Sequence, residues 1–253
     1  MKSWIACLVL CAWACSLQAQ DTKSNRDFLK NDDFSVGGGL HSNGWNILVE
    51  RGYIKDAYHR HFWQLEYTQL HHPMEYRQSQ NPSFQLTDAP KAFVFGKQNS
   101  FLTLNAYLGK QRLLGNKGDK SGVLISLKYQ AGVSLGFLKP YYLDLIYSVD
   151  SSGRFIDKIE RYSDSNASRF LDPNSIYGGA GFWKGITQLT PLPGIAAKVS
   201  LNFDWATYDD FVKSVETGLM AQFYYKPVPI MVVKHNRMLF PELFVHFQFG
   251  KRW

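Results

Sequence analysis

Gly122-Val-Leu-Ile-Ser-Leu-Lys-Tyr-Gln-Ala-Gly-Val-Ser-Leu-Gly136 is the stretch of sequence that decides the fold. Every second position in it is apolar, in the order Val123, Ile125, Leu127, Tyr129, Ala131, Val133 and Leu135. The positions between them are mostly small or polar, so the stretch has the period of a β-strand with two unlike faces. A helix would place Lys128 and Gln130 among the apolar positions, and the internal glycines also disfavour a helix.

The length of this stretch points to a membrane. At about 3.3 Å per residue it reaches roughly 50 Å, whereas a strand in a soluble protein usually has about five or six residues. A tilted membrane strand needs only about 9–11 residues. The chain of 253 residues has no run of eighteen apolar residues that would cross a bilayer as a helix. Any membrane insertion must therefore use strands, and the 15% of aromatic residues suits a membrane interface.

Residues 1–19 have the features of a secretory signal peptide. Lys2 gives a positive start, residues 4–14 are apolar, and Leu17-Gln18-Ala19 is a plausible cleavage site. The three cysteines lie within this leader, so the mature chain is expected to have no disulfide and no thiolate metal site. An alternative makes Cys15 a lipidated N-terminus, although Trp13 fits a lipidation motif poorly. Residues 20–32 are polar and are expected to form a flexible lead-in.

The mature domain, 33–253, is predicted to contain about ten antiparallel strands. We expect them at 33–41, 44–53, 61–70, 92–108 (as one strand or broken near Lys97), 122–136, 141–148, 176–182, 194–205, 213–225 and 240–253. Ser42-Asn43-Gly44 predicts a hairpin turn that sets Leu40 opposite Trp45. A second tight return at Leu138-Lys139-Pro140 would pair 141–148 with the central strand.

Alternation alone also fits a lipocalin-like barrel or a β-sandwich. The outer face of a small soluble barrel is usually rich in Lys and Glu. Here the polar rows consist mainly of Gly, Ser, Asn, Gln and Thr, which suits a crowded, hydrogen-bonded lumen. The expected fold is therefore all-β: a single antiparallel transmembrane β-barrel of about ten strands, within a range of about 8–12.

The end of the chain resembles the closing strand of Gram-negative outer-membrane β-barrel proteins. Trp253 is a terminal aromatic, preceded at two-residue steps by Phe249, Phe247 and Val245, while Lys251 departs from the pattern. The ending Phe-Gly-Lys-Arg-Trp, together with Lys-Pro-Tyr-Tyr-Leu and Pro-Ile-Met, is similar to an uncharacterised family of small outer-membrane barrels. This resemblance implies export by the Sec route and a place in the cell outer membrane, and it implies no activity.

Three sequence features resemble ligand sites. Residues 115–121 resemble a phosphate loop but lack the required glycine and a following helix, so we expect a turn. The basic residues Lys110, Arg112, Lys117 and Lys120 would suit lipid phosphates, or simply a solvated turn. Two histidine pairs, His59/His61 and His71/His72, have metal-ligand spacing but no well-spaced carboxylate. We expect no metal site and no cofactor.

Catalysis is also not expected. His71-His72 and Asp209-Asp210 would suit a rim-site hydrolase, but counting strands back from the C-terminus puts them on opposite sides of the membrane. A second group of charged residues is expected to pair across the lumen in a structural role: Lys128, Lys198, Asp204, Glu66 and Glu216.

The sequence therefore predicts a structural or accessory outer-membrane protein, for example a subunit of an assembly or export complex. Its expected partners are outer-membrane lipid, the barrel insertion machinery through the C-terminal strand, and proteins at the long loops. The formal charge of +7, about +6 without Lys2, gives no nucleic-acid signature. A narrow channel for small solutes or lipids is the main alternative, followed by a rim-site hydrolase or a soluble lipocalin-like binding barrel.

One feature conflicts with the count of ten strands. With both chain ends in the periplasm, the long charged segment 149–175 would lie on the periplasmic side, where turns are usually short. Either the segment is unusual or the count is wrong. A missed strand in 229–234 or a split near Lys97 would change the parity.

Overall fold

The computed structural model describes residues 32–56, 59–79, 91–115, 123–149, 155–205, 210–232 and 236–253. The expected signal peptide (1–19) and all but the last residue of the expected lead-in (20–32) lie outside this part of the chain. Within the described residues, no helix has both the length and the apolar character needed to cross a membrane.

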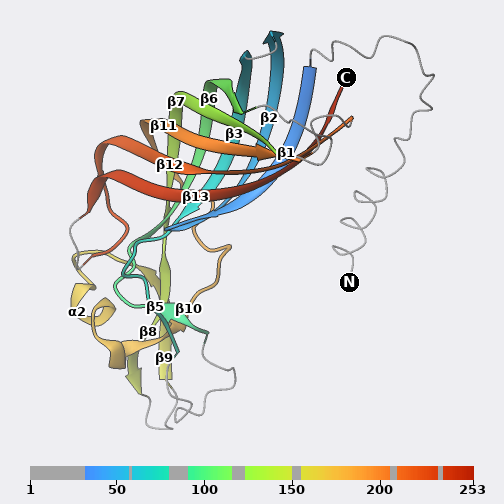
Figure 1. Cartoon of the computed structure of the whole chain (residues 1–253). Coiled ribbons are helices and arrows are strands. Elements are labelled where there is room, and N and C mark those ends of the chain that lie inside the picture. Colours follow the sequence, from blue (N-terminus) through green and yellow to red (C-terminus); the bar gives the residue numbers. More distant parts are fainter. Residues whose placement is uncertain are drawn as a thin grey trace. The chain divides into compact units, whose positions relative to one another are not determined.

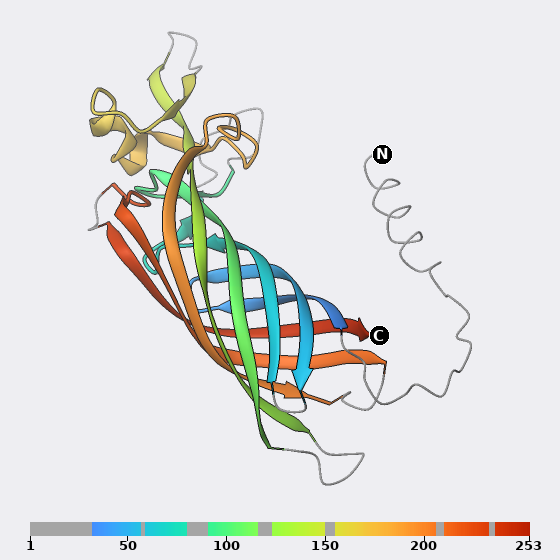
Figure 2. The same cartoon turned by 90° about the horizontal axis from the view of Figure 1, so that it is seen from above.

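Eight long strands form a closed antiparallel barrel (Figures 1 and 2). They are β1 (Asp32–His41), β2 (Gly44–Asp56), β3 (His59–Leu70), β6 (Asn99–Gly115), β7 (Leu124–Pro140), β11 (Thr190–Asp204), β12 (Phe211–Val228) and β13 (Arg237–Arg252). Each strand pairs with the next barrel strand along the chain. The last pairs with the first, from Asp33 opposite Arg252 to His41 opposite Phe244, so the sheet has no open edge.

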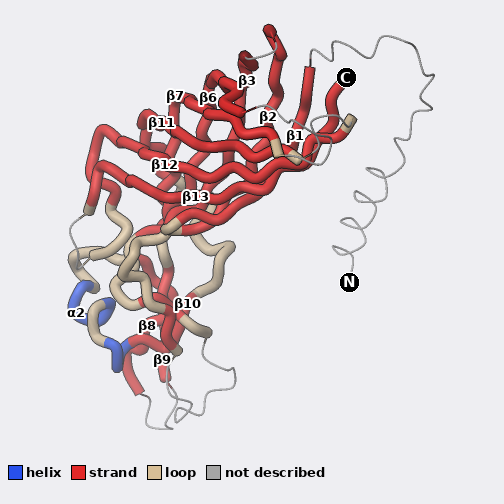
Figure 3. Tube along the Cα trace, viewed as in Figure 1, coloured by secondary structure: helices blue, strands red, loops and turns tan. Residues whose placement is uncertain are grey.

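The remaining elements are short and lie in the connections (Figure 3). They are β4 (Arg77–Gln78), β5 (Phe93–Val94), β8 (Tyr142–Val149), β9 (Phe155–Arg161), α2 (Ala167–Phe170), the 3-10 helix η1 (Pro173–Ser175) and β10 (Ile176–Gly179). The strands β10, β8 and β9 form their own sheet, and β4 pairs with β5. We call the described residues 141–149 and 155–189 the cap. It has its own apolar core, made with Phe93 of β5: Phe93, Leu143, Leu145, Phe170 and Ile176.

The two faces of the barrel wall have opposite character along every long strand. In β7, for example, Val133 is 65% exposed on the outer surface, while the adjacent Ser134 is 3% exposed and faces inward. Large apolar side chains cover the outside of all eight strands, including Leu40, Ile47, Leu65, Leu108, Val133, Ile195, Leu219 and Phe249. Polar and charged side chains fill the inside. The two-faced pattern expected for the central strand is therefore confirmed.

The predicted first hairpin is also confirmed. Leu40 lies opposite Trp45 and Val36 opposite Val49, with a two-residue turn at Ser42 and Asn43. Here the turn sequence fixes the register, and the register places apolar side chains of both strands on one surface.

The expected all-β antiparallel barrel is confirmed, and its eight strands lie at the lower limit of the expected range of about 8–12. The count of about ten is wrong, because two of the ten expected strands belong to the cap. Strand β7 does not turn back at Leu138 but continues to Pro140, and it pairs with β11 up to Leu138 opposite Thr190. Strand β8 pairs with β9 and β10 and not with the central strand as expected, so Asp144 lies opposite Gly178. The alternating residues Leu143 and Leu145 bury into the cap core, and this burial gives β8 the same period as a membrane strand.

Eight strands also resolve the problem of the long charged segment. The connections after β3, β7 and β12 all leave from one end of the barrel, which we call the mouth end. Both ends of the described chain lie at the other end, where Asp32 and Trp253 bond through their backbones. The described part of segment 149–175 therefore lies on the side opposite the termini. The expected split near Lys97 does occur, but the first piece, β5, is outside the barrel. The described part of 229–234 adds no barrel strand, since Met231 makes only an isolated bridge to Lys97.

Candidate functional site

The middle of the barrel is filled by buried ion pairs. Lys128 Nζ on β7 lies 2.6 Å from Glu50 Oε2 on β2 and 2.8 Å from Glu216 Oε2 on β12. Glu50 also accepts a hydrogen bond of 2.8 Å from Arg60 Nη1. Ser200 Oγ donates to Glu216 at 2.6 Å. These charges are shielded from water and compensate one another, which is the condition for charges to be tolerated inside a protein.

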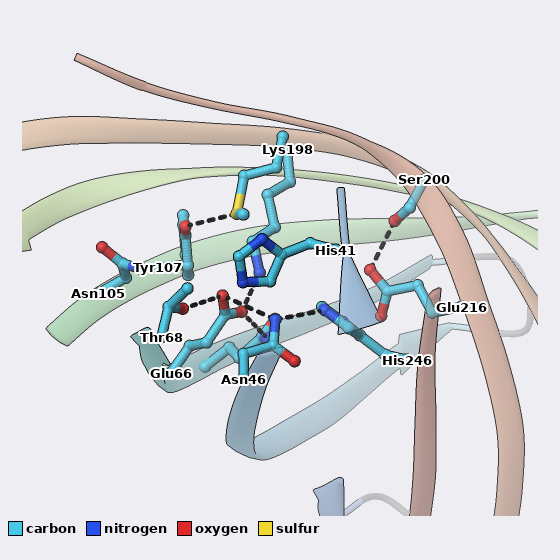
Figure 4. Close-up of polar contacts among 12 residues, drawn as sticks. His41, Asn46, Glu66, Thr68, Asn105, Tyr107, Lys198, Ser200, Glu216 and His246 are labelled. Atoms are coloured by element: carbon cyan, nitrogen blue, oxygen red, sulfur yellow. Dashed lines mark hydrogen bonds and ion pairs between the residues drawn. The ribbon is translucent and has the colours of Figure 1, made fainter. Parts of the chain in front are cut away.

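A second group centres on Glu66 (Figure 4), which lies nearer the mouth-end terminus of β3 than Arg60 does. Glu66 forms an ion pair with Lys198 and accepts hydrogen bonds from Thr68 at 2.9 Å and from Asn46 at 3.2 Å. Asn46 Nδ2 also lies 2.7 Å from Nε2 of His246, so this nitrogen of the imidazole accepts the amide proton. The Glu66 carboxylate thus accepts hydrogen bonds from side chains of several strands, and these bonds link the strands across the lumen.

The prediction of lumen charges is confirmed. Four of the five expected residues form the two groups above, and the fifth, Asp204, forms an ion pair with Arg252 on β13. All five are at most 4% exposed: Glu66, Lys128, Lys198, Asp204 and Glu216. The pairs join strands that are not neighbours, so the side chains cross the lumen and fill it.

An apolar cluster fills the barrel next to the mouth end. We call it the stopper, and it consists of Leu70, Phe101, Leu138, Leu192, Tyr224, Val228, Ile230, Met231 and Phe240. Phe101 packs edge-on against Tyr224, with ring centroids 5.0 Å apart. Ile230 and Met231 come from the β12–β13 connection, which is fixed by bonds from Gln98 N and Asn99 N to Ile230 O. The stopper therefore closes the lumen with apolar side chains above the ion pairs.

A cavity of about 710 Å³ lies between the barrel and the cap at the mouth end. We call it the mouth cavity. Its walls come from the β3–β6 connection (His71, His72, Glu75, Arg77, Lys91 and Lys97), the end of β7 (Lys139) and the cap (Tyr141, Tyr142, Phe182 and Lys184). Five of its lining side chains are basic and one is a carboxylate. The cavity is therefore electropositive.

The single carboxylate of the mouth cavity is already bonded. Glu75 Oε2 lies 2.6 Å from Lys97 Nζ, and Glu75 Oε1 accepts from the backbone of His72 at 3.1 Å. His72 Nδ1 accepts from the backbone of Met74 at 3.2 Å, which places the ring proton of the neutral imidazole on Nε2. Burial lowers the pKa of His71, and Lys97 lowers it further, while Glu75 opposes the shift. Both imidazoles can thus act as neutral hydrogen-bonding groups.

Lys139 is the most enclosed cation of the mouth cavity, with an exposed fraction of 3%. Its Nζ donates to the backbone oxygen of Phe182 and lies 3.7 Å from the centroid of the Phe182 ring. Among the described residues it has no carboxylate partner. A carbonyl and a ring face stabilise an ammonium only in part, so this buried charge is incompletely compensated.

The structure separates the other residues that the sequence singled out. His59 and His61 begin β3 while His71 and His72 follow its end, so the two histidine pairs lie at opposite ends of the barrel. Asp210 is at the end with the termini, where its backbone accepts from Arg252, and this confirms its separation from His71. Within the described residues, no group of three or more His, Cys, Asp or Glu is arranged to hold a metal.

Part of the expected phosphate-like turn lies outside the described residues. This applies to 116–121, including Lys117 and Lys120, and also to Asp209 of the acidic pair. Lys110 and Arg112 are exposed on the outside of β6, near the end with the termini. They lie far along the barrel from the mouth cavity, so they do not contribute to it.

Sequence reasoning missed the mouth cavity. Its basic residues come from three separate segments and share no spacing or motif. They meet only because the chain leaves the barrel at Tyr141, whose backbone bonds Gln98, and because Gly179 bonds Lys91 across the two connections. The one signal that would have helped was the excess of basic over acidic residues near the strand ends at 91–97 and 139.

Comparisons with known proteins gave distant similarities. No protein-family model matches the chain, and no curated protein matches it. Among solved structures, Ail, the attachment invasion locus protein of Yersinia pestis in complex with the heparin analogue sucrose octasulfate, has a TM-score of 0.40 and 9% identity over 88% of this chain and 98% of that chain.

Two further solved structures are similar at the same level. Neisserial surface protein A gives a TM-score of 0.38 and 8% identity, covering 89% of this chain and 98% of that chain. The N-terminal β-barrel domain of OprF from Pseudomonas aeruginosa gives 0.31 and 12%, covering 87% and 98%. Similarities this weak carry no argument about function, and the closed barrel described above rests on its own strand pairing.

Proposed function

We propose that this chain is an outer-membrane β-barrel protein whose filled barrel anchors it and whose mouth end presents the cap to partners. One observation carries the proposal: the barrel is apolar outside and charged inside, the reverse of a soluble barrel. Soluble monomers rarely expose an apolar patch larger than a few hundred Å². A continuous apolar band around a closed barrel is instead suited to lipid.

The filled lumen favours a structural or accessory role over transport. Lys128 and Lys198 cross the lumen in ion pairs, and the stopper closes it towards the mouth end. An ion or solute would have to break buried pairs that are costly to separate. The narrow channel is therefore the weaker alternative.

A non-enzymatic role is also proposed. Among the described candidates for rim-site chemistry, His71 and Asp210 lie at opposite ends of the barrel. Glu66 and His246, which lie close together, are sealed inside it by the stopper and the surrounding pairs. A general base must reach the proton that it removes, and neither arrangement offers this to a substrate.

The mouth end offers the surface for partners. Its three connections bond to one another: Tyr141 N donates to Gln98 O at 2.9 Å, and Val232 N donates to Gly96 O at 2.9 Å. The cap adds its own core, so it is a folded platform and not a set of independent loops. This construction suits a subunit that binds other proteins of an outer-membrane assembly or export complex.

Two measurements on the full chain test the proposal. Membrane fractionation is expected to place the protein in the outer membrane with a folded form that migrates differently from the heated form on gels. Planar-bilayer recording of the purified protein is expected to give no steady conductance above background. A soluble periplasmic protein would contradict the membrane assignment, and regular single-channel steps would favour the channel. Crosslinking in intact membranes would then identify partners at the cap.

A further inference from the structure

We propose that the mouth cavity binds a phosphate-type oxyanion carried by a small molecule or a lipid headgroup. The first support is its charge. Five basic side chains line it against one carboxylate, and that carboxylate already bonds Lys97. Four cations therefore face the cavity without a carboxylate among the lining residues: Arg77, Lys91, Lys139 and Lys184.

The second support is the enclosure of Lys139. Lys139 is 3% exposed, its ammonium is held against the carbonyl and ring of Phe182, and Lys97 repels it electrostatically. Taking a charge out of water is costly unless an opposite charge accompanies it. An anion in the mouth cavity would supply that charge, and it would form charge-assisted hydrogen bonds, which are stronger than neutral ones.

The third support is the supply of neutral donors beside the cations. The Tyr141 hydroxyl oxygen accepts from Val94 N at 3.2 Å, so its own proton remains to be donated. Arg77 lies close enough to this hydroxyl to act on it electrostatically. Hydroxyl, ammonium and guanidinium donors around one space suit an acceptor-only ligand with several oxygens. They do not suit a metal cation.

The size of the mouth cavity indicates more than a bare ion. Its volume of about 710 Å³ is within the range of pockets for small molecules, about 300–1,000 Å³. A single phosphate would fill only a small part of it. We therefore assign it to a phosphorylated compound or headgroup. The proposal that the mouth cavity binds a phosphate group does not depend on the membrane assignment. The proposal that this phosphate belongs to a lipid does depend on it.

Two binding measurements on the purified full chain test the inference. In dodecyl maltoside, calorimetric titration with inorganic pyrophosphate measures binding of a soluble probe. In nanodiscs, the fluorescence of a labelled phosphatidic acid measures binding of a lipid headgroup, and phosphatidylcholine is the comparison lipid. Saturable binding of pyrophosphate favours a soluble ligand, and saturable binding of phosphatidic acid alone favours a headgroup. Absence of both at millimolar ligand overturns the proposal.

Three variants connect binding to this cavity. Lys139→Met is expected to weaken binding at least about tenfold, since one charge-assisted hydrogen bond contributes about this factor. Glu75→Gln removes the competing carboxylate and is expected to tighten binding, a change that loss of folding would not produce. The matched control is Lys158→Met, because Lys158 is an exposed lysine of the cap outside the cavity.

Salt provides a second criterion. Binding through charges is expected to weaken as NaCl rises from about 0.05 M to about 0.5 M, because screening shortens the range of the interaction. The assignment would be overturned if Lys139→Met and Lys158→Met lowered the affinity for the probe equally. It would also be overturned if Glu75→Gln left the affinity unchanged, because the anion would then be held elsewhere. A protein that fractionates as soluble but binds pyrophosphate would contradict the membrane assignment alone.

Discussion

Lys128 Nζ lies 2.6 Å from Glu50 Oε2 although two strands, β6 and β3, separate β7 from β2 around the barrel wall. The bond therefore spans the lumen and does not follow the sheet. Since Lys128 also bonds Glu216 at 2.8 Å, one ammonium joins two distant parts of the barrel. Backbone pairing closes the wall, and this bridge fills the space within it.

The Lys128 bridge makes the first prediction. Lys128→Met is expected to lower the free energy of unfolding by about 3–5 kcal/mol, because it removes the ammonium that pairs with the buried Glu216 carboxylate and leaves Glu50 with Arg60 alone. Urea unfolding of the protein folded in detergent measures this change. Lys128→Met combined with Glu216→Gln is expected to recover part of the loss.

Lys213→Met is the matched control, since Lys213 is exposed on the outside of β12. It is expected to change stability by less than about 0.5 kcal/mol. A similar loss in both lysine variants would show that the buried bridge has no special role.

The second prediction separates lipid from water outside the barrel. Val133, near the middle of β7, is 65% exposed, and Ile156 of the cap is 56% exposed. Val133→Arg is expected to cost about 2–4 kcal/mol if lipid surrounds it. Ile156→Arg is expected to be nearly silent, because water surrounds the cap. Unfolding of both variants in lipid vesicles is the measurement, and equal tolerance of arginine at the two positions would contradict the membrane assignment.

The period-two pattern made the barrel strands predictable from the sequence. The rows of β1, β7, β11, β12 and β13 repeat it without interruption, and the turn at Ser42 and Asn43 sets its own register. Paired charges such as Lys198 and Glu66 were also predictable, because a charge on the polar face of such a strand must lie in the lumen. All of these predictions used local information, namely the alternation of side chains within a single strand or hairpin.

The strand count failed where that local signal is ambiguous. Leu143 and Leu145 alternate like lipid-facing residues, but their partners are Phe170 and Ile176, which lie further along the chain. Periodicity cannot tell burial in a small core from burial in lipid. The mouth cavity was unpredictable for a related reason: Lys97 and Lys139 meet through the packing of two connections.

The third prediction concerns the space that Gly136 leaves for the stopper. A Cβ at Gly136 would lie 2.6 Å from Cε2 of Phe101 and 3.1 Å from Cε1 of Tyr224. Gly136→Ala is therefore expected to destabilise the barrel by about 1–3 kcal/mol, the usual cost of overpacking. Gly38→Ala is the matched control, since its Cβ would meet only Asn46 O at 3.4 Å. Unfolding midpoints compare the two, and an equal effect would mean that the stopper is loosely packed.

The fourth prediction is a pH dependence of the cap. Burial and then the carboxyl of Asp157 raise the pKa of Asp144 from 3.8 to about 6. Between these values the folded cap holds a proton that the unfolded chain has lost, so stability falls as the pH rises through about 6. Hydrogen exchange in β8 and β9 is expected to show weaker protection at about pH 7.5 than at about pH 4.5, after correction for intrinsic rates.

Asp144→Asn serves as the control for this titration. The amide does not ionise in this range, so protection in the variant is expected to be the same at both pH values and, at the higher pH, greater than in the original protein. A variant that keeps the full pH dependence would assign it to another group.

The C-terminal residue closes the barrel seam. Trp253 N donates to Asp32 O at 3.0 Å, and Asp32 N donates to Trp253 O at 3.2 Å, while Trp253 as a whole is 52% exposed. Lys251, which departs from the expected apolar pattern, lies on the outer face opposite Phe34 on one side and Phe211 on the other. Its stem can cover these rings while the ammonium reaches water. The departure is therefore compatible with an outer-membrane closing strand.

The last prediction is that the final strand acts as the assembly signal. Before closure β13 is an open edge, and strand addition at such an edge uses backbone bonds while side chains give specificity. Deleting Trp253 removes two terminal bonds and an exposed ring, so refolding of the purified chain in detergent should be almost normal. In cells, the truncated chain should accumulate unfolded in the periplasm, with loss of the heat-modifiable band. Trp253→Phe, which keeps a terminal aromatic, should restore that band. Normal amounts of heat-modifiable truncated protein in the outer membrane would refute the role of Trp253 in assembly.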